Sequence, residues 1–160
     1  MVNTQAPSAE QLWQFSLALY AKVQPLCLQW QDNFGLNVNL LLLLCYLEQH
    51  QLSLSSSQLQ QLAATLDSFS RDFTKPLRQL RRNSSQAPLT PARQQQLKQA
   101  LLKAELVAEQ LEQQLLLAHC PPLSLTAKPL IELYLVVLNV DIPTLSGQLF
   151  DLRQALQQQR

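Results

Sequence analysis

The most apolar stretch of the chain runs from Val38 to Leu47, and apolar side chains occupy almost every one of its ten positions. A helix that is apolar on all sides is buried by other helices. The stretch is too short for a bilayer, which needs about 20 residues, so we expect no membrane insertion. Asn37 is a suitable N-cap, and the helix should end near His50. We therefore predict a central apolar helix over about residues 37–50.

Helix-start signals and helical spacing of apolar residues predict further helices around this one. Ser8 and Ser55 each open a capping box, in which side chains satisfy the first free backbone amides. Thr90 followed by Pro91 is an N-cap with proline at the first helical position. The predicted helices cover 8–34 with a kink or break at Pro25, 55–82 with a kink or break at Pro76, 91–118, 129–138 and 143–157.

The composition agrees with one all-helical domain. The chain has 160 residues, of which 47% are hydrophobic, and this is enough to bury a core. Glycine occurs only twice and β-branched residues are sparse, whereas sheets and their turns rely on both. The predicted fold class is all-α, a single-domain bundle of six or seven helices over residues 8–157. We expect residues 1–7 to be a disordered tail and residues 158–160 to be frayed.

Five of the twelve basic residues fall in one short segment, at Arg71, Lys75, Arg78, Arg81 and Arg82. Four of them, all except Arg81, are spaced four, three and four residues apart and would form one row on a helix. The apolar residues of the same segment, Phe69, Phe73, Leu77 and Leu80, lie on roughly the opposite side, so we expect them to be buried and the basic row to be exposed.

The basic row has two interpretations. Glu105, Glu109 and Glu112 form an acidic row on a later helix, but a short antiparallel connection at residues 83–90 would place Arg78 near Gln95 and leave the acids beside residues 61–68. The row is then either a solvated face or a site for an acidic partner, which would be a protein surface or a nucleic-acid backbone. The net charge of +1 gives the whole molecule no field that attracts nucleic acid.

Aromatic residues are concentrated in the first third of the chain, which holds six of the ten. Aromatics at helical spacing usually form a packed core. The alternative is a pocket for an apolar or aromatic ligand, with polar groups near its entrance. The candidate pocket residues are Trp13, Tyr20, Trp30, Asn37 and Asn39.

The sequence shows no signature of catalysis, of a metal or of a cofactor. It has no Gly-rich phosphate loop and no nucleophile elbow, and adjacent His119 and Cys120 would not face each other on a helix. The histidines and cysteines lack the spacing of metal ligands. The odd number of cysteines and the lack of a secretion signal favour reduced thiols in a cytoplasmic protein.

Three stretches occur in order along the chain: Phe15-Ser-Leu-Ala-Leu-Tyr20, Gly35-Leu-Asn-Val-Asn-Leu-Leu-Leu42 and Pro76-Leu-Arg-Gln-Leu-Arg-Arg82. Together they resemble a small bacterial family of uncharacterised, Leu/Ala-rich cytosolic proteins, a domain of unknown function. The family pattern has Asp-Val-Asn-Leu-Leu in the second stretch, where this chain has Asn37 in place of the Asp and retains Asn39. The resemblance implies no activity, and its basic motif agrees with the row found by spacing.

Our leading hypothesis from the sequence is a non-catalytic helical binding or adaptor module, which contacts an acidic partner through the basic face at 71–82. The alternative is a ligand-binding protein or small enzyme with a pocket in the aromatic first third. Self-association through the broad first helix or the Leu-rich last helix is a further possibility.

Overall fold

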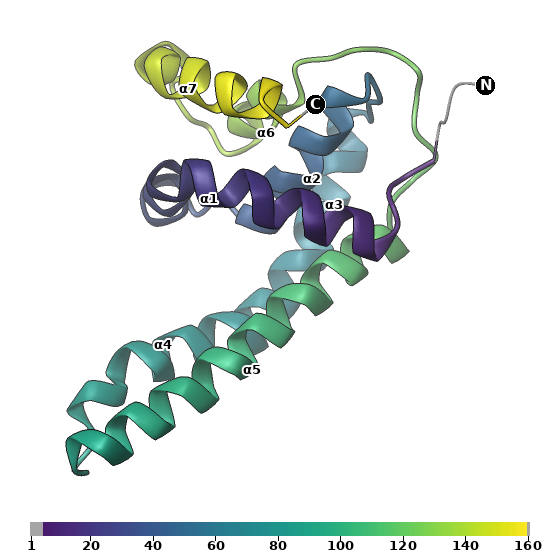
Figure 1. Ribbon diagram of the computed structural model, residues 1–160. Helices are drawn as coiled ribbons and strands as arrows, with labels where there is room; N and C mark the ends of the chain where they lie inside the picture. The colour runs from purple at the N-terminus through teal and green to yellow at the C-terminus, as the bar shows by residue number, and fades with distance from the viewer. Residues whose placement is uncertain (1–4, 160) are drawn as a thin grey trace.

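The computed structural model describes residues 5–159, and within that range the protein is all-helical, as predicted (Figure 1). The described residues contain no strand, only one isolated antiparallel bridge between Ser53 and Ser124. A π-helical segment at Ser70–Thr74 and 3₁₀ segments at Ser84–Gln86 and Ile142–Leu145 complete the helical structure. The α-helices are α1 (Ala9–Phe34), α2 (Val38–Gln49), α3 (Ser56–Phe69), α4 (Lys75–Asn83), α5 (Pro91–Ala118), α6 (Leu130–Val137) and α7 (Ser146–Gln157).

The structure describes only part of the predicted disordered tail, residues 1–7, and of the predicted frayed terminus, residues 158–160. Residues 1–4 and residue 160 lie outside the described range. Gln5, Ala6 and Pro7 are not helical, and Pro7 is buried. Gln158 and Gln159 form a turn after α7.

The central helix is α2, which packs against α1, α5, α6 and α7. Every residue of Leu40–Leu44 is buried, in agreement with the apolar pattern. Two local features set its position. Gly35 ends α1 with φ of +69°, a left-handed conformation that strains other residues, and the Asn37 side chain accepts from the Leu40 amide at 3.1 Å.

The first helix, α1, bends where Pro25 predicts it. Val23 has non-helical backbone angles, φ −125° and ψ 18°, two residues before the proline. Proline has no N–H to donate and its ring collides with the preceding turn, so the helix must open there. The bend lets both halves of α1 pack against the body, where Leu12, Leu19 and Trp30 are fully buried.

One part of the molecule projects from the rest. The short helix α4 and the first half of α5 lie side by side as an antiparallel pair that extends away from the other helices (Figure 1). We call this pair, residues 75–104, the arm. None of the residues of α4 is buried. The fold is therefore a helical body with an arm.

The π-helical segment Ser70–Thr74 joins α3 to α4 and changes which side chains face inward. A π turn holds more residues than an α turn, so each extra residue rotates the following side chains by about 100° relative to a continuous α-helix. We predicted that the buried stripe would continue through Phe73 and Leu80. This prediction was wrong, because the two side chains are 57% and 55% exposed.

From the end of the π segment onward, the inward positions differ from the predicted apolar stripe. Thr74 and Ser84 are buried, and the Arg81 side chain is only 25% exposed. The rotation thus turns guanidinium groups toward α5 and turns Phe73 and Leu80 toward solvent.

The three cysteines form no disulfide, and Cys27 and Cys45 are buried. Burial raises the pKa of Cys27 to about 12 and also raises the pKa of Cys45 and Cys120. The thiols therefore stay protonated at neutral pH and pack as small apolar groups. Among the helices of residues 5–159, none combines the length and the apolar character needed to cross a membrane.

Candidate functional site

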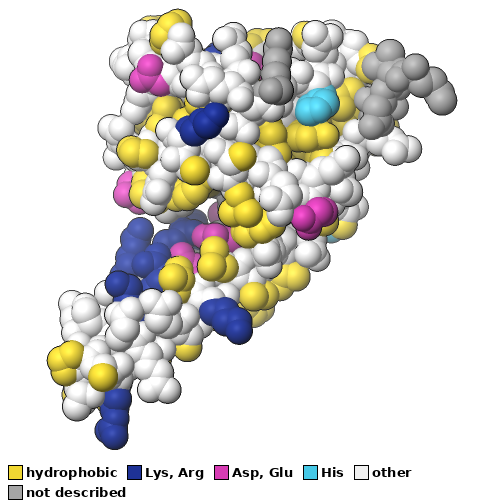
Figure 2. Space-filling model, viewed as in Figure 1, with side chains coloured by type: hydrophobic (Ala, Val, Ile, Leu, Met, Phe, Trp, Pro, Cys, Tyr) yellow, Lys and Arg dark blue, Asp and Glu magenta, His cyan; other side chains and the backbone are white. Residues whose placement is uncertain are grey.

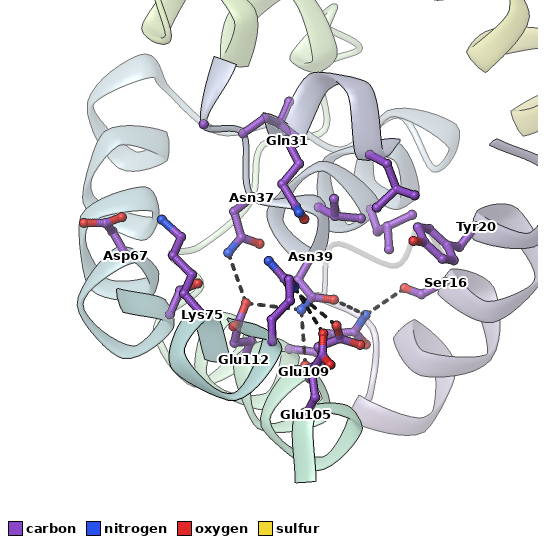
Figure 3. A pocket seen from close by; sticks show the side chains of 18 of the residues that line it. Ser16, Tyr20, Gln31, Asn37, Asn39, Asp67, Lys75, Glu105, Glu109 and Glu112 are labelled. Carbon is purple, nitrogen blue, oxygen red and sulfur yellow. Dashed lines mark hydrogen bonds and ion pairs between the residues drawn. The ribbon is translucent and has the colours of Figure 1, made fainter. Parts of the chain in front are cut away.

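A cavity of about 750 Å³ lies between the arm and the body. Figure 2 shows the hollow at this junction, with basic and acidic side chains gathered beside it. Side chains from α1, α2, α3, α4, α5 and α6 line it (Figure 3). The two sets of residues that the sequence presented as separate sites meet here, since the lining includes Trp13, Tyr20, Asn37 and Asn39 together with Lys75, Arg78, Arg81 and Arg82.

Two of the candidate residues lie elsewhere. Trp30 is fully buried and its Nε1–H donates to Gln148 Oε1 at 2.9 Å, so it joins α1 to α7. Arg71 is largely exposed and lies 3.3 Å from Asp72 and 4.0 Å from Asp67. Neither residue lines the cavity. Trp30 is a core residue, and Arg71 is a surface ion-pair residue.

Arg78 and Arg81 are engaged within the protein rather than exposed. Arg78 Nε donates to Glu105 Oε1 at 3.1 Å, and Arg81 binds both carboxylate oxygens of Glu105. Arg78 Nη2 also lies 3.6 Å from Glu109 Oε1. Glu105 itself is only 4% exposed.

The register that we predicted between α4 and α5 was therefore wrong. We expected Gln95 opposite Arg78, with the acids beside α3, but Glu105 lies opposite Arg78. Helical structure continues past Asn83 through the 3₁₀ segment to Gln86, so the chain reverses later than the sequence indicated. The π segment then rotates the arginines toward α5.

The pKa values of two neighbouring carboxyl groups shift in opposite directions, downward for Glu105 and upward for Glu109. Burial alone would raise the pKa of Glu105, but hydrogen bonds from Arg81 and Arg78 and their positive charges outweigh it and hold the pKa below its ordinary value. Burial, followed by the negative charge of Glu105, raises the pKa of Glu109, and Arg78 offsets only part of this effect.

Lys75 and Arg82 are the cations of the cavity that remain available. Both are exposed and both line the cavity. Neither has an ion-pair partner among the acidic groups of residues 5–159. Of the basic row predicted from the sequence, these two side chains are the ones free to meet an anion.

A hydrogen-bonded network of amides forms the buried wall of the cavity (Figure 3). Asn37 Nδ2 and Asn39 Nδ2 both donate to Glu112 Oε1, at 3.0 Å and 3.2 Å. Gln113 Nε2 donates to Asn39 Oδ1 at 3.1 Å and to Ser16 Oγ at 2.9 Å. Glu112 and Gln113 are each only 2% exposed.

The hydroxyl of Tyr134 closes the same wall from α6. It accepts from the backbone amide of Asn37 at 3.0 Å. Burial raises the pKa of Tyr134 to about 12, so the hydroxyl keeps its proton at neutral pH.

The sequence did not identify Ser16, Glu112, Gln113 or Tyr134 as site residues. On α5, the helical spacing of apolar residues predicts a buried stripe through Val107 or Ala108 and then Leu111. Ala108 is buried, as this stripe requires, but Val107 and Leu111 are 48% and 44% exposed. The inward row is Glu105, Ala108, Glu112 and Leu116, which keeps helical spacing but mixes charged with apolar residues. The acidic row of Glu105, Glu109 and Glu112 was the sequence signal of this site. The predicted register placed these residues beside α3 and not beside the arginines of α4.

Of three comparisons with known proteins, the one with family models found a match, and it covers most of the chain. The model of the family DUF2390, described as a protein of unknown function, matches residues 11–116 of the 160 residues. The chain belongs to this family. The match includes every residue that lines the cavity except Tyr134 and Val137 of α6 and Leu138, which caps that helix. Searches of curated proteins and of solved structures found no match.

The side chains of the cavity are suited to binding polar organic groups. Three or more potential metal ligands of the His, Cys, Asp or Glu type do not converge anywhere in residues 5–159. The cavity combines apolar surface from α1 and α6 with guanidinium, ammonium, amide and carboxylate groups. Such a mixture is typical of pockets in which a few polar groups fix the orientation of a small molecule.

We predict that Glu105→Gln destabilises the protein by about 3 kcal/mol at neutral pH, because it leaves partly buried Arg81 without a carboxylate and Arg78 with Glu109 alone. The pKa of Glu105 in the folded state lies below its ordinary value of 4.5, so this stabilisation is complete above that pH and is lost as the pH falls below it. Urea unfolding at pH 7 and pH 3 measures the difference.

Arg71→Gln is the matched control, because Arg71 is 63% exposed and its ion pairs are worth less than about 1 kcal/mol. Equal losses for the two variants, or a loss for Glu105→Gln that stays undiminished at pH 3, would contradict the assignment of Glu105 as the residue that holds the arm.

Proposed function

We propose that this protein binds a small organic anion in the cavity between the arm and the body, without catalysing a reaction. The observation that carries the proposal is the meeting of Lys75 and Arg82, two unpaired cations, with the polar wall of Asn37 and Asn39 in one cavity of about 750 Å³. Pockets for small ligands span about 300–1,000 Å³. This combines the two functional hypotheses from the sequence at a single site.

The charges around the cavity support an anionic group near its open end. Arg78 and Arg81 are neutralised by Glu105 and Glu109, so they shape the cavity more than they attract a ligand. Lys75 and Arg82 lie on the same helix at the exposed margin and carry charges that no acid within residues 5–159 offsets. A carboxylate or phosphate that reaches both would gain charge-assisted hydrogen bonds.

The apolar wall supports a ligand with a hydrocarbon or aromatic portion. Trp13 and Leu17 on α1 line the cavity, and so do Val137 on α6 and Leu138, the C-cap of that helix. Leu17 is 49% exposed. Covering such surface contributes about 25 cal/mol for each Å² removed from water.

A second candidate function is a contact between the arm and an acidic protein. Residues 75–104 contain seven basic residues and no acidic residue, whereas the rest of the chain has five basic and eleven acidic residues. Exposed Leu80 and Leu97 lie among these cations. Apolar side chains between charges favour an acidic protein surface over a phosphate backbone, which offers nothing apolar to cover them.

We also place the protein in the cytoplasm of a bacterial cell. The support is the resemblance to a bacterial family and the three unpaired cysteines, of which two are buried and none is close to ionising at neutral pH.

Titration of the protein with aryl and alkyl carboxylates and phosphate monoesters, followed by ligand-detected NMR, tests the binding function. We expect the anions to bind and their neutral amides and alcohols to bind more weakly. The double variant Lys75→Gln/Arg82→Gln should lose about tenfold in affinity, which corresponds to about 1.4 kcal/mol.

The matched control is Arg93→Gln/Lys98→Gln, which removes two exposed cations of the arm that do not line the cavity. It should retain full affinity. The proposal fails if anions bind no better than their neutral analogues, or if the two double variants lose affinity equally.

Affinity capture from cell lysate tests the second candidate. Arg93→Glu/Lys98→Glu should abolish capture of acidic proteins with the thermal midpoint unchanged, because both residues are exposed. Nuclease treatment should not alter what is captured. An identical set of captured proteins with the unmodified chain and with the variant would rule this function out.

A further inference from the structure

Two buried hydrogen-bond acceptors in the wall of the cavity have no donor within residues 5–159. They are Glu112 Oε2 and Gln113 Oε1, and no hydrogen bond from a described side chain or backbone amide reaches either atom. Both residues line the cavity and both are only 2% exposed. Buried polar atoms are nearly always paired, and an unpaired one costs about 1–3 kcal/mol.

The hydrogen-bond network fixes the identity of these two atoms. An ionised carboxylate can only accept, so the atom of Asn39 that faces Glu112 Oε1 at 3.2 Å must be its NH₂ group. The oxygen of Asn39 then faces Gln113, whose NH₂ group must be the donor at 3.1 Å. The remaining atom of the Gln113 amide is therefore an oxygen, and it can only accept.

The charge of Glu112 is also uncompensated. Its first oxygen accepts from Asn37 and Asn39, which are neutral, and no Lys, Arg or His group within residues 5–159 forms an ion pair with it. A buried carboxylate is costly unless a positive charge accompanies it. In Figure 3 its carboxylate lies beside Asn37 and Asn39, at the α5 side of the cavity.

We propose that the ligand carries a protonated amino group that donates to Glu112 Oε2 and Gln113 Oε1. This inference rests on the binding function proposed above and specifies the class of ligand. The anionic group faces Lys75 and Arg82 at the exposed margin, and the amino group occupies the buried wall. The ligand is then amphoteric, with an apolar portion between its two charged ends, as in a short peptide.

An ammonium group fits this pair of acceptors better than a metal ion does. Metal sites in proteins need several ligands around the ion, and no group of three or more His, Cys, Asp or Glu side chains converges within the described residues. An ammonium group needs only acceptors, has three N–H bonds to direct, and brings the charge that Glu112 lacks.

The charged side chains that line the cavity are equal in number for the two signs. Its lining has four basic side chains, Lys75, Arg78, Arg81 and Arg82, and four acidic ones, Asp67, Glu105, Glu109 and Glu112. Internal pairing removes Arg78 and Arg81 with Glu105 and Glu109, and Asp67 lies 4.0 Å from Arg71. The charged groups of the lining that remain unpaired within the described residues are Lys75 and Arg82 on α4 and Glu112 on α5. A ligand with an anionic group and an ammonium group has charges opposite to these.

Three forms of one apolar dipeptide test the amino group directly. The probes are leucyl-leucine, its N-acetyl derivative, which lacks the ammonium group, and its C-terminal amide, which lacks the carboxylate. Titration calorimetry with the unmodified protein should show the free dipeptide binding at least about tenfold more tightly than the N-acetyl form. The amide should also bind more weakly than the free dipeptide.

Glu112→Gln assigns the effect to this residue. The glutamine oxygen can still accept from Asn37 and Asn39, so the network should persist, while the preference for the free dipeptide over the N-acetyl form should disappear. Asp151→Asn, which removes an exposed charge on α7, is the control and should keep that preference.

The measurement on the unmodified protein decides the inference even if Glu112→Gln does not fold. Equal binding of the free and N-acetyl forms overturns the amino group while leaving the binding of anions intact. Absence of binding by all three forms also overturns it, and the binding function is then judged by the carboxylate and phosphate series alone. A preference for the free form that survives in folded Glu112→Gln overturns the role of Glu112.

Discussion

The ion pair of Glu105 with Arg78 and Arg81 is the interaction on which the site depends. Glu105 is 4% exposed, and it holds α4 against α5 where no apolar core does so, since α4 has no buried residues of its own. A buried ion pair adds little to stability compared with apolar packing, but removing one partner is costly. Its effect here is geometric, because it fixes α4 against the middle of α5, where both helices line the cavity.

The π-helical segment makes this ion pair possible. With a continuous α-helix from Ser56 to Asn83, Phe73 and Leu80 would face α5 and the arginines would face solvent. The extra residues of Ser70–Thr74 reverse this arrangement and leave two large apolar side chains more than half exposed. Irregular helical segments of this type occur often at functional sites, and this one lies at the base of the arm, where Ser70 lines the cavity.

The amide and carboxylate network between α2 and α5 is a second costly feature of the interior. The neighbouring positions Leu40–Leu44 are all buried, so apolar residues in place of Asn39, Glu112 and Gln113 would continue an ordinary core. A buried polar network that is only partly satisfied is less favourable than an apolar core. Departures from apolar packing of this kind are expected at binding sites, and the network borders the cavity rather than the centre of the body.

Much of the fold could be predicted from the sequence because its signals are local. The capping boxes at Ser8 and Ser55, the left-handed Gly35 and the Asn37 cap each act within one helical turn, and the structure contains all four. The site could be predicted only in parts. Spacing identified the basic row and the acidic row, but it assumed a single helical period through Ser70–Thr74 and so misplaced the buried stripe on α4. On α5 the inward row keeps the helical period, but it includes Glu105 and Glu112, which a search for apolar residues passes over. The spacing of apolar residues gives no sign of the π segment at Ser70–Thr74, after which α4 packs against α5.

The central claim is that the cavity between arm and body holds one small molecule. Native mass spectrometry of the purified protein, incubated with a small-molecule extract of the cells that make it, measures this directly. We predict a single one-to-one adduct whose mass is that of a compound with both an amino and an acidic group, and its loss in Lys75→Gln/Arg82→Gln. A protein that stays at the mass of its sequence, or an adduct that the double variant retains, would contradict the account.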